Sequence, residues 1–209
     1  MEHSKFSSDI FDKHARLYQQ KYSHLTIYDE TYDRFCELLT KKAARVLDAT
    51  CGPGNVARYL LQRRPDFELV GIDLAPTMIE LAREAAPGGK FAVHDCRELA
   101  DLGAFDGIIC AFGFPYLSSE EVAHFIADAA TALAPGGVFY LSTMEGKHED
   151  SGFQTTSTGD KVCINYHSEA HLVSALENHG FSIADKRRMP SPGSAPNKTT
   201  DLFIIALRA

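Results

Sequence analysis

The sequence predicts an α/β fold built on a doubly wound, Rossmann-like sheet with helices on both faces. From Ala43 onward, short apolar runs alternate with amphipathic stretches, and this alternation implies parallel strands joined by right-handed crossovers. The apolar runs are nearly continuous, as expected for strands whose two faces are both covered by helices. Glycine, proline and capping residues stand at the boundaries between the runs, where such residues begin or end helices.

The expected elements alternate regularly up to residue 143. Strands are expected at 44–49, 67–72, 90–94, 105–111 and 137–143, and helices at 55–63, 76–86 and 119–133. Pro76 suits the first turn of the second helix. Ser118 and Glu121 form a capping-box motif, in which two side chains satisfy free backbone N–H groups at the start of the third helix. Pro135 and the two glycines that follow it end that helix.

Both ends of the chain depart from this alternation. Residues 5–40 contain two amphipathic helical patterns rich in Tyr and His. We expect residues 1–42 to form an N-terminal helical cap and residues 43–209 to form the main domain, within which residues 145–167 are a possible hairpin lid.

The segment 145–167 begins polar and rich in Gly, Ser and Thr. Residues 154–158 and 161–166 could pair as a β-hairpin. The hairpin either covers the carboxyl edge of the sheet as a lid or lies exposed and merely extends that edge. A helix at 168–179, strands at 181–188 and 201–208, and a loop at 191–198 complete the expected elements.

Composition narrows the class of function. A chain of 209 residues fits one domain of ordinary size. Its formal net charge of −7 argues against a nucleic-acid partner, because phosphate neutralisation needs a basic face. No apolar run reaches membrane-spanning length, and the first residues lack the apolar stretch of a signal peptide. The five cysteines show no metal or redox spacing, so we expect free thiols in the cytoplasm and no metal.

The most informative stretch is VLDATCGPGNVA, from Val46 to Ala57. A strand runs into a glycine loop that opens a helix, so a ligand can approach the backbone and the free N–H groups there. The spacing of Gly52, Gly54 and Ala57 also fits the dinucleotide fingerprint. Asp73 ends the second strand, where a ribose-binding carboxylate belongs in nicotinamide enzymes too. These residues predict an adenosine ribose and leave a nicotinamide-dependent oxidoreductase open.

Two further carboxylates favour one of these ligands. Asp48 ends the first strand beside the loop, where a buried carboxylate would repel a pyrophosphate and attract an ammonium and a sulfonium. Asp95 ends the third strand, where it can accept a hydrogen bond from the exocyclic amine of adenine. Carboxyl ends of neighbouring strands line the ligand crevice of doubly wound folds, so S-adenosylmethionine is the better fit.

Here the chain resembles the class I S-adenosylmethionine-dependent methyltransferases. The segments that carry the resemblance are VLDATCGPG, VGIDLAPTMIELAR, HDCREL, FDGIICAFGFPYL and LAPGGVFYLST. It covers residues 43–144 well and the final two strands more loosely, and it implies a seven-stranded sheet with an antiparallel last strand. The chain departs from the family pattern at Ala49 and Thr50, where glycine is common.

The resemblance implies a set of cofactor contacts. Asp48 would hold the methionine amino group, directly or through water, Asp73 would bind both ribose hydroxyls, and Asp95 would contact the adenine. The full set implied is Asp48, Ala49, Thr50, Cys51, Gly52, Gly54, Asp73, Leu74, Met78, Asp95, Cys96, Ala111 and Tyr22. Two alternatives without a cofactor contact remain: Asp73 could cap a helix, and Asp95 could be a solvated loop residue.

The function that the resemblance implies is in-line methyl transfer to a small-molecule acceptor. The alternatives are a cofactor-binding module without catalysis and the nicotinamide-dependent oxidoreductase.

The acceptor side carries no readable catalytic motif. A general base helps only when the acceptor has a proton that must leave, and the candidates are His148, His167 and Tyr166. Phe114 and Tyr116 follow the fourth strand and would contact the substrate, together with Tyr166 and His167. Phe114 and Tyr116 could instead pack against the helix at 119–133. His148 and His167 could instead be surface residues without a catalytic role.

Overall fold

Seven strands form one mixed sheet in the computed structural model, which describes residues 2–192 and 199–209. The strands are β1 (Arg45–Asp48), β2 (Glu68–Asp73), β3 (Lys90–Val93), β4 (Phe105–Ala111), β5 (Leu133–Glu145), β8 (Phe181–Pro190) and β9 (Thr200–Arg208). Their order is β3-β2-β1-β4-β5-β9-β8, with β9 antiparallel to both of its neighbours. The expected seven-stranded sheet with an antiparallel last strand is confirmed.

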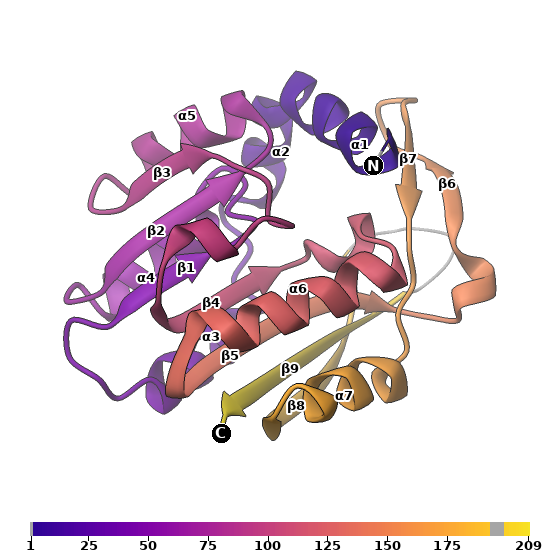
Figure 1. Ribbon diagram of the computed structural model, residues 1–209. Coiled ribbons are helices and arrows are strands. Elements are labelled where there is room, and N and C mark those ends of the chain that lie inside the picture. The colour runs from indigo at the N-terminus through magenta and orange to yellow at the C-terminus, as the bar shows by residue number, and fades with distance from the viewer. Residues whose placement is uncertain (1, 193–198) are drawn as a thin grey trace.

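The helices cover both faces of this sheet. They are α1 (Glu2–Lys13), α2 (Ala15–Tyr22), α3 (Asp29–Leu38), α4 (Asn55–Arg63), α5 (Pro76–Ala85), α6 (Ser119–Ala132) and α7 (Glu169–Asn178). Figure 1 shows α6 and α7 in front of the sheet and α3 and α4 behind it. One hydrophobic cluster joins α6 and α7 to the front face, and a second joins α3, α4 and α5 to the other.

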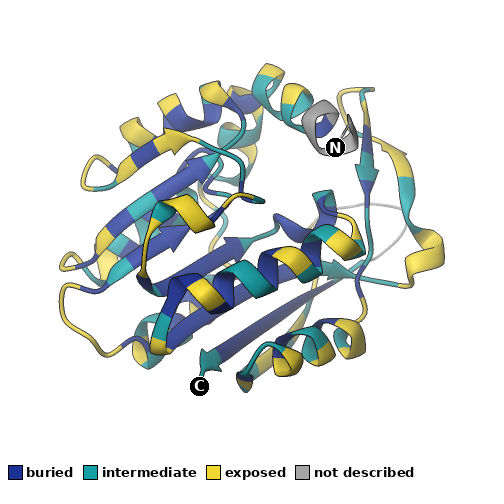
Figure 2. Ribbon diagram, in the orientation of Figure 1, coloured by how far each residue is buried: buried dark blue, intermediate teal, exposed yellow. Residues whose placement is uncertain are grey.

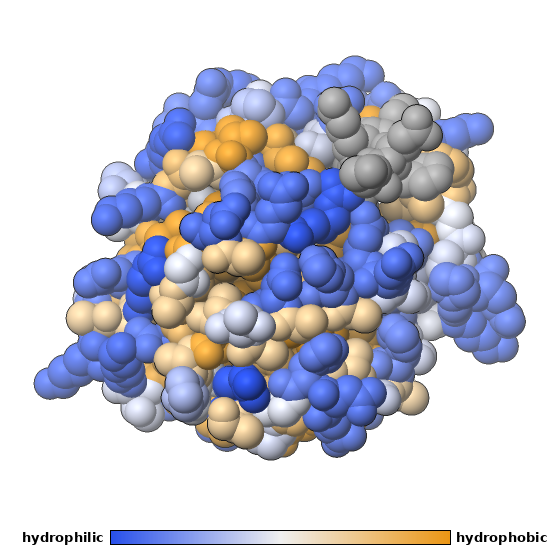
Figure 3. Space-filling model, viewed as in Figure 1, coloured by the Kyte–Doolittle hydropathy of each residue, from blue (hydrophilic) through white to orange (hydrophobic). Residues whose placement is uncertain are grey.

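Burial follows the same layers. The central strands are buried along most of their length, and the exposed residues lie mainly on the outer faces of the helices and in loops (Figure 2). On the face drawn in Figure 3, hydrophilic residues surround smaller hydrophobic areas. No helix in the described part of the chain is both long enough and apolar enough to cross a bilayer.

The capping box at the start of α6 forms as the sequence predicts. The Ser118 Oγ accepts from the Glu121 N–H at 3.2 Å, and the Glu121 carboxylate accepts from the Ser118 N–H at 2.8 Å. Two of the free N–H groups at this helix end are therefore satisfied.

The N-terminal segment differs from expectation in the number of helices. The sequence predicts two helical patterns within residues 5–40, whereas the structure forms α1, α2 and α3 there. The chain leaves helical geometry at His14, which separates α1 from α2. Both α1 and α2 contact α5, and α1 also contacts β7, so the break accompanies the contact of α1 with the hairpin.

The predicted hairpin is present with a longer turn. Its strands are β6 (Gly152–Thr155) and β7 (Lys161–Ile164). Strand pairing stops at Thr155 because the Thr156 N–H and hydroxyl both bond to the Asp160 carbonyl, at 2.8 and 3.1 Å. Figure 1 shows β7 beside α1. Of the loop expected at 191–198, residues 193–198 lie outside the described residues.

Candidate active site

A cavity of about 740 Å³ lies at the carboxyl edge of the sheet. The sheet order reverses between β1 and β4, and the segments that follow these two strands both line the cavity. Doubly wound folds bind ligands at this kind of switch point. The cavity also reaches α1, α2 and the start of β9, so it extends well beyond the glycine loop.

Asp73 organises the loop side of the cavity. Its carboxylate accepts from the Gly52 N–H and from the Ala75 N–H, each at 2.9 Å. The second bond is of the kind that caps a helix, here at the start of α5. Asp73 nevertheless lines the cavity, and a carboxylate has about four acceptor sites, so two donors leave room for ligand hydroxyls. Burial raises the pKa of this group above its ordinary value.

The two loop glycines have different surroundings. Gly52 has φ +49° and open space where a Cβ would stand, and it lines the cavity. Gly54 has φ +82°, and a Cβ there would lie 2.8 Å from the Ala82 Cα of α5. Gly54 permits close packing of the loop on α5 and does not line the cavity, whereas its neighbours Pro53 and Asn55 do. The expected access of a cofactor to the Gly54 backbone stays a prediction.

Asp48 lies behind the loop. Its side chain is fully buried and does not line the cavity. Burial, followed by repulsion from Asp73, raises the pKa of Asp48 to about 8; the Thr50 and Ala57 N–H groups act in the opposite sense without completing a hydrogen bond of normal geometry. Because Asp48 does not line the cavity, only the water-mediated form of its expected contact with the methionine amino group stays a prediction. A cation in front of the loop would favour ionisation of this buried carboxyl group, which has no bonded partner, and so lower its pKa, which fits S-adenosylmethionine.

The shifted pKa of Asp48 makes stability depend on pH. Between 3.8 and about 8 the folded protein holds a proton on Asp48, whereas the unfolded chain has lost it. Rising pH therefore favours unfolding across this window. We expect the free energy of unfolding to fall by roughly 2–4 kcal/mol more in the wild type than in Asp48→Asn. Urea denaturation of both proteins at several pH values inside the window measures this difference, and parallel curves would contradict it.

The adenine side is held by an ion pair that the sequence analysis missed. Asp95 lines the cavity, but the Arg97 guanidinium contacts both of its oxygens, with Nε at 2.9 and 3.0 Å. Arg97 also binds Glu121 of α6 at 2.8 Å. Burial acts to raise the pKa of Asp95, and Arg97 outweighs it and holds that pKa below its ordinary value. Asp95 is therefore an ionised, oriented acceptor, rather than a freely solvated loop residue.

Most of the expected cofactor residues come together around the cavity. Those that line it are Tyr22, Ala49, Thr50, Cys51, Gly52, Asp73, Leu74, Met78, Asp95, Cys96 and Ala111. All five cysteines are free thiols, as expected.

In the part of the cavity where the acceptor is expected, Phe112 lines the wall and Phe114 does not. The Phe114 ring is fully buried and packs edge-on against Phe125 at 5.4 Å, so the expectation that it lines the acceptor pocket is wrong. Phe112 lines the cavity instead. Its φ of +56° is uncommon outside glycine, and its N–H bonds to the Ser142 hydroxyl at 3.0 Å. Only its place directly after Ala111 could have drawn attention to Phe112 in the sequence.

The hairpin candidates do not reach the cavity. His167 is buried, with Nε2 at 3.0 Å from the Phe114 carbonyl, and burial lowers its pKa. The Tyr166 hydroxyl accepts from the Gln154 amide at 2.9 Å. His148 is exposed, at the start of a short 3₁₀ turn. A surface position therefore describes His148 but not His167, and the structure brings none of the three to an acceptor.

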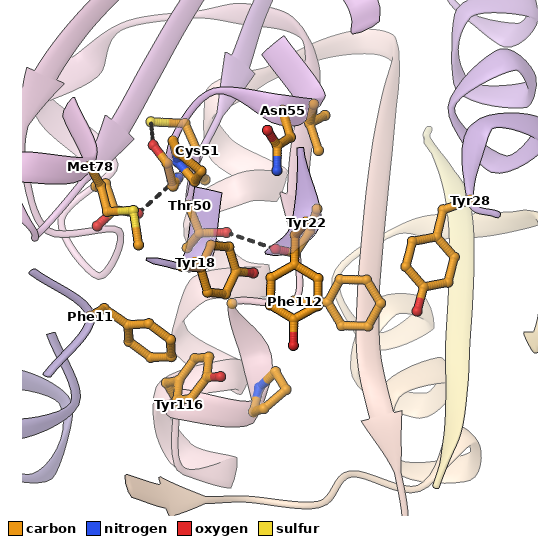
Figure 4. A pocket seen from close by; sticks show the side chains of 18 of the residues that line it. Phe11, Tyr18, Tyr22, Tyr28, Thr50, Cys51, Asn55, Met78, Phe112 and Tyr116 are labelled. Carbon is orange, nitrogen blue, oxygen red and sulfur yellow. Dashed lines mark hydrogen bonds between the residues drawn. The ribbon is translucent and has the colours of Figure 1, made fainter. Parts of the chain in front are cut away.

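Aromatic rings from α1 and α2 form the roof. Figure 4 shows Phe11, Tyr18, Tyr22 and Tyr116 turned toward one another at the cavity. Phe11 lies 5.9 Å from Tyr18 and 4.9 Å from Tyr116, and Tyr18 lies 4.6 Å from Tyr22, between ring centroids. Tyr116 therefore occupies the place expected for it, while Tyr18 lines the cavity in addition to packing.

The far end of the cavity holds a carboxylate that sequence reasoning missed. Asp201 is 2% exposed and lines the cavity. It accepts hydrogen bonds from Tyr28 and Ser191. A single acid between the polar loop before residue 200 and the apolar run LFIIAL was the available signal, because a carboxylate next to a buried strand needs a partner.

Comparisons with known proteins agree with this geometry. Residues 46–137 match a methyltransferase domain family. The demethylmenaquinone methyltransferase of Thermus thermophilus is 38% identical over 104 residues, which is 47% of this chain and 46% of that protein. The trans-aconitate 2-methyltransferase of Variovorax paradoxus is 33% identical over 109 residues, 52% of this chain and 41% of that protein. The chain thus spans about half the length of these curated relatives, or somewhat less.

Among solved structures, the magnesium protoporphyrin IX methyltransferase of Synechocystis with bound S-adenosylhomocysteine superimposes with a TM-score of 0.78. The match covers 99% of this chain and 100% of that one at 19% identity, which shows the fold. The seven-stranded sheet and its edge cavity thus define a Rossmann-like methyltransferase fold. Residues 46–137 are thus similar to a methyltransferase domain, and the sheet as a whole has the fold of solved S-adenosylmethionine-dependent methyltransferases.

Proposed function

We propose that this protein transfers the methyl group of S-adenosylmethionine to a small-molecule acceptor. The observation that carries the proposal is Asp73, which is fixed by Gly52 and Ala75 and faces the cavity that also contains the aromatic residues. Bound S-adenosylmethionine would supply a methyl group on a good leaving group. The chain's own task is then to hold an acceptor in line with that methyl group and to exclude water.

Two observations favour this proposal over its alternatives. The Asp48 carboxyl group is fully buried behind the loop, and its pKa is raised to about 8. A cationic ligand would be stabilised by its ionisation, whereas a pyrophosphate would oppose that ionisation, which argues against a nicotinamide cofactor. The cavity continues past the loop to Tyr28 and Asp201, so space for a second ligand remains. That space argues against a module that only binds the cofactor.

The cavity lining also bears on the class of acceptor. Among the described residues that line it, the carboxylates are Asp29, Asp73, Asp95 and Asp201, and the guanidinium groups are Arg58 and Arg97. Aromatic side chains are Phe11, Tyr18, Tyr22, Tyr28, Tyr32, Tyr59, Phe112 and Tyr116. An excess of carboxylates repels polyanions, so we propose a flat, uncharged or cationic acceptor rather than a tricarboxylate such as that in the name of the Variovorax relative.

Turnover on an acceptor panel tests the proposal. Release of S-adenosylhomocysteine is measured with flat aromatic alcohols, aromatic amines and small polycarboxylates. We expect turnover with aromatic members and none with polycarboxylates. Tight cofactor binding without turnover on any compound would favour the binding module, and preference for a polycarboxylate would contradict the proposed acceptor class.

We also propose that residues 1–42 and the hairpin within 145–167 cover the occupied cavity. The hairpin turn is tied to the junction of α1 and α2, since Asp160 lies 3.0 Å from Lys13 and 2.7 Å from His14. The Pro115 carbonyl also accepts from the Asn165 N–H at 2.7 Å. These contacts link the hairpin to the roof of the cavity, while the hairpin itself contributes no lining residue among those described.

Loss of the Asp160 contacts should open this cover. In Asp160→Ala we expect the amides of 152–164 to exchange hydrogen several-fold faster and S-adenosylhomocysteine to dissociate faster, since Lys13 and His14 lose their shared partner. Hydrogen exchange and stopped-flow dissociation measure the two effects. Glu149→Ala, which removes the exposed pair with Lys147, is the control and should change neither. Unchanged dissociation in Asp160→Ala would reject the cover.

A further inference from the structure

The far end of the cavity contains a hydrogen-bond network in which every hydroxyl donates toward Asp201, either directly or through Ser191. Asp201 accepts from the Tyr28 hydroxyl through Oδ2 and from the Ser191 hydroxyl through Oδ1, each at 2.5 Å. The Thr199 hydroxyl donates to the Ser191 oxygen at 2.8 Å. All four residues line the cavity.

This polarity decides what the network can offer a ligand. An ionised carboxylate only accepts hydrogen bonds, and a hydroxyl has one hydrogen and two lone pairs. Because Tyr28, Ser191 and Thr199 each commit that hydrogen within the network, the capacity left over belongs to oxygen lone pairs, among them those of Tyr28 and Asp201. A ligand group that donates a hydrogen bond satisfies them, whereas an ether or a carboxylate does not.

Two residues of this network, Tyr28 and Asp201, are buried and packed in the protein interior rather than placed on its surface. Asp201 is 2% exposed and Tyr28 is 6% exposed. Tyr28 packs against Phe112 at 5.2 Å and against Phe203 at 5.1 Å between ring centroids. Burial raises the pKa of Asp201, while Ser191 and Tyr28 act against that rise. The two hydroxyls therefore stabilise the ionised form.

Phe112 places a flat apolar surface beside these acceptors. Its left-handed backbone conformation follows Ala111 directly at the end of β4, and strained non-glycine residues of this kind cluster at ligand sites. Figure 4 shows the Phe112 and Tyr28 rings near each other on the side of the cavity away from Met78. A ring held against Phe112 could thus present a polar substituent to Tyr28.

We propose that Tyr28, Asp201 and Phe112 form an acceptor subsite that selects an aromatic molecule carrying a hydrogen-bond donor, a hydroxyl or an amino group. This inference rests on the proposed methyltransferase function and specifies its acceptor. Tyr28 contacts the donor group directly, and Asp201 acts as a positioning residue that keeps the Tyr28 hydrogen turned away from the ligand.

A matched pair of probes tests the subsite. Affinities for 2-naphthol and for 2-methoxynaphthalene, in which a methyl group replaces the donor hydrogen, are measured on protein saturated with S-adenosylhomocysteine. We expect the wild type to bind 2-naphthol about tenfold more tightly. In Tyr28→Phe and in Asp201→Asn the preference should fall to about twofold or less, because phenylalanine removes the oxygen and an asparagine amide lets the hydroxyls reverse direction.

The control is Tyr140→Phe. It removes another buried tyrosine hydroxyl from the same cluster, one that bonds to Thr31 at 3.0 Å and does not line the cavity. This variant should keep the tenfold preference. A third probe, 2-naphthylmethylamine, distinguishes an ammonium donor from a hydroxyl, and tighter binding of either donor supports the subsite.

The outcomes separate the two proposals. Equal affinities of the wild type for 2-naphthol and 2-methoxynaphthalene, with S-adenosylhomocysteine bound, would overturn the subsite alone. Failure of the wild type to bind S-adenosylhomocysteine would overturn the proposed function. Affinity of each variant for S-adenosylhomocysteine shows that it is folded, since the loop contacts come from β1 and β2 rather than from this network.

Discussion

Asp73→Ala is expected to weaken S-adenosylhomocysteine binding by roughly 2–4 kcal/mol. The substitution removes a half-buried charged acceptor from the cavity lining, and two ligand hydroxyls then lose their partner. It also frees the Gly52 and Ala75 N–H groups that this carboxylate holds at 2.9 Å, so the glycine loop loses its anchor. Titration calorimetry on folded protein measures the change.

Two further variants separate these effects. Asp73→Asn keeps one acceptor oxygen for the loop but loses the charge, so we expect an intermediate loss of affinity. Asp101→Ala removes an exposed carboxylate outside the cavity and should leave affinity unchanged. A dissociation constant for Asp73→Ala equal to that of the wild type would mean that Asp73 serves only the loop and α5.

Gly54→Ala is expected to lower the free energy of unfolding by roughly 2–5 kcal/mol. Alanine at φ +82° is strained, and its Cβ would stand 2.8 Å from the Ala82 Cα. The neighbour is backbone in the middle of α5, so it cannot move aside as a flexible side chain would. The loop or the helix must shift instead, and urea denaturation reports the resulting loss of stability.

Gly52→Ala is the matched control. It carries a similar backbone strain at φ +49° but meets nothing within 4 Å, so its loss of stability should be only about 1–2 kcal/mol. Because Gly52 lines the cavity, the larger effect of this variant should be on cofactor affinity. Equal destabilisation by the two substitutions would show that packing on α5 is not what requires glycine at position 54.

The parts of the fold that local chemistry dictates could be predicted from the sequence. The capping box of α6, the apolar strands and the turn after α6 each depend on residues close together in the chain. The break at His14 could not be predicted in this way, because it accompanies the contact of α1 with β7, which lies far away in the sequence.

The same distinction holds for the site. Asp73 and Thr50 could be placed because each follows a predicted strand. Phe112 has a left-handed backbone conformation, and this conformation decides which side chain after β4 faces the cavity. No sequence pattern predicts it, so Phe114 is assigned the cavity position from the sequence instead. Tyr28 and Asp201 meet across 173 positions of sequence, and only the sheet order brings them together.

The most direct test of the central claim is a calorimetric comparison of two ligands on the wild-type protein. We predict saturable binding of S-adenosylhomocysteine and no measurable heat with NAD under the same conditions, because a ligand ammonium group favours ionisation of the buried Asp48 carboxyl group behind the loop, whereas a pyrophosphate opposes it. Tight binding of NAD with no binding of S-adenosylhomocysteine would contradict the account.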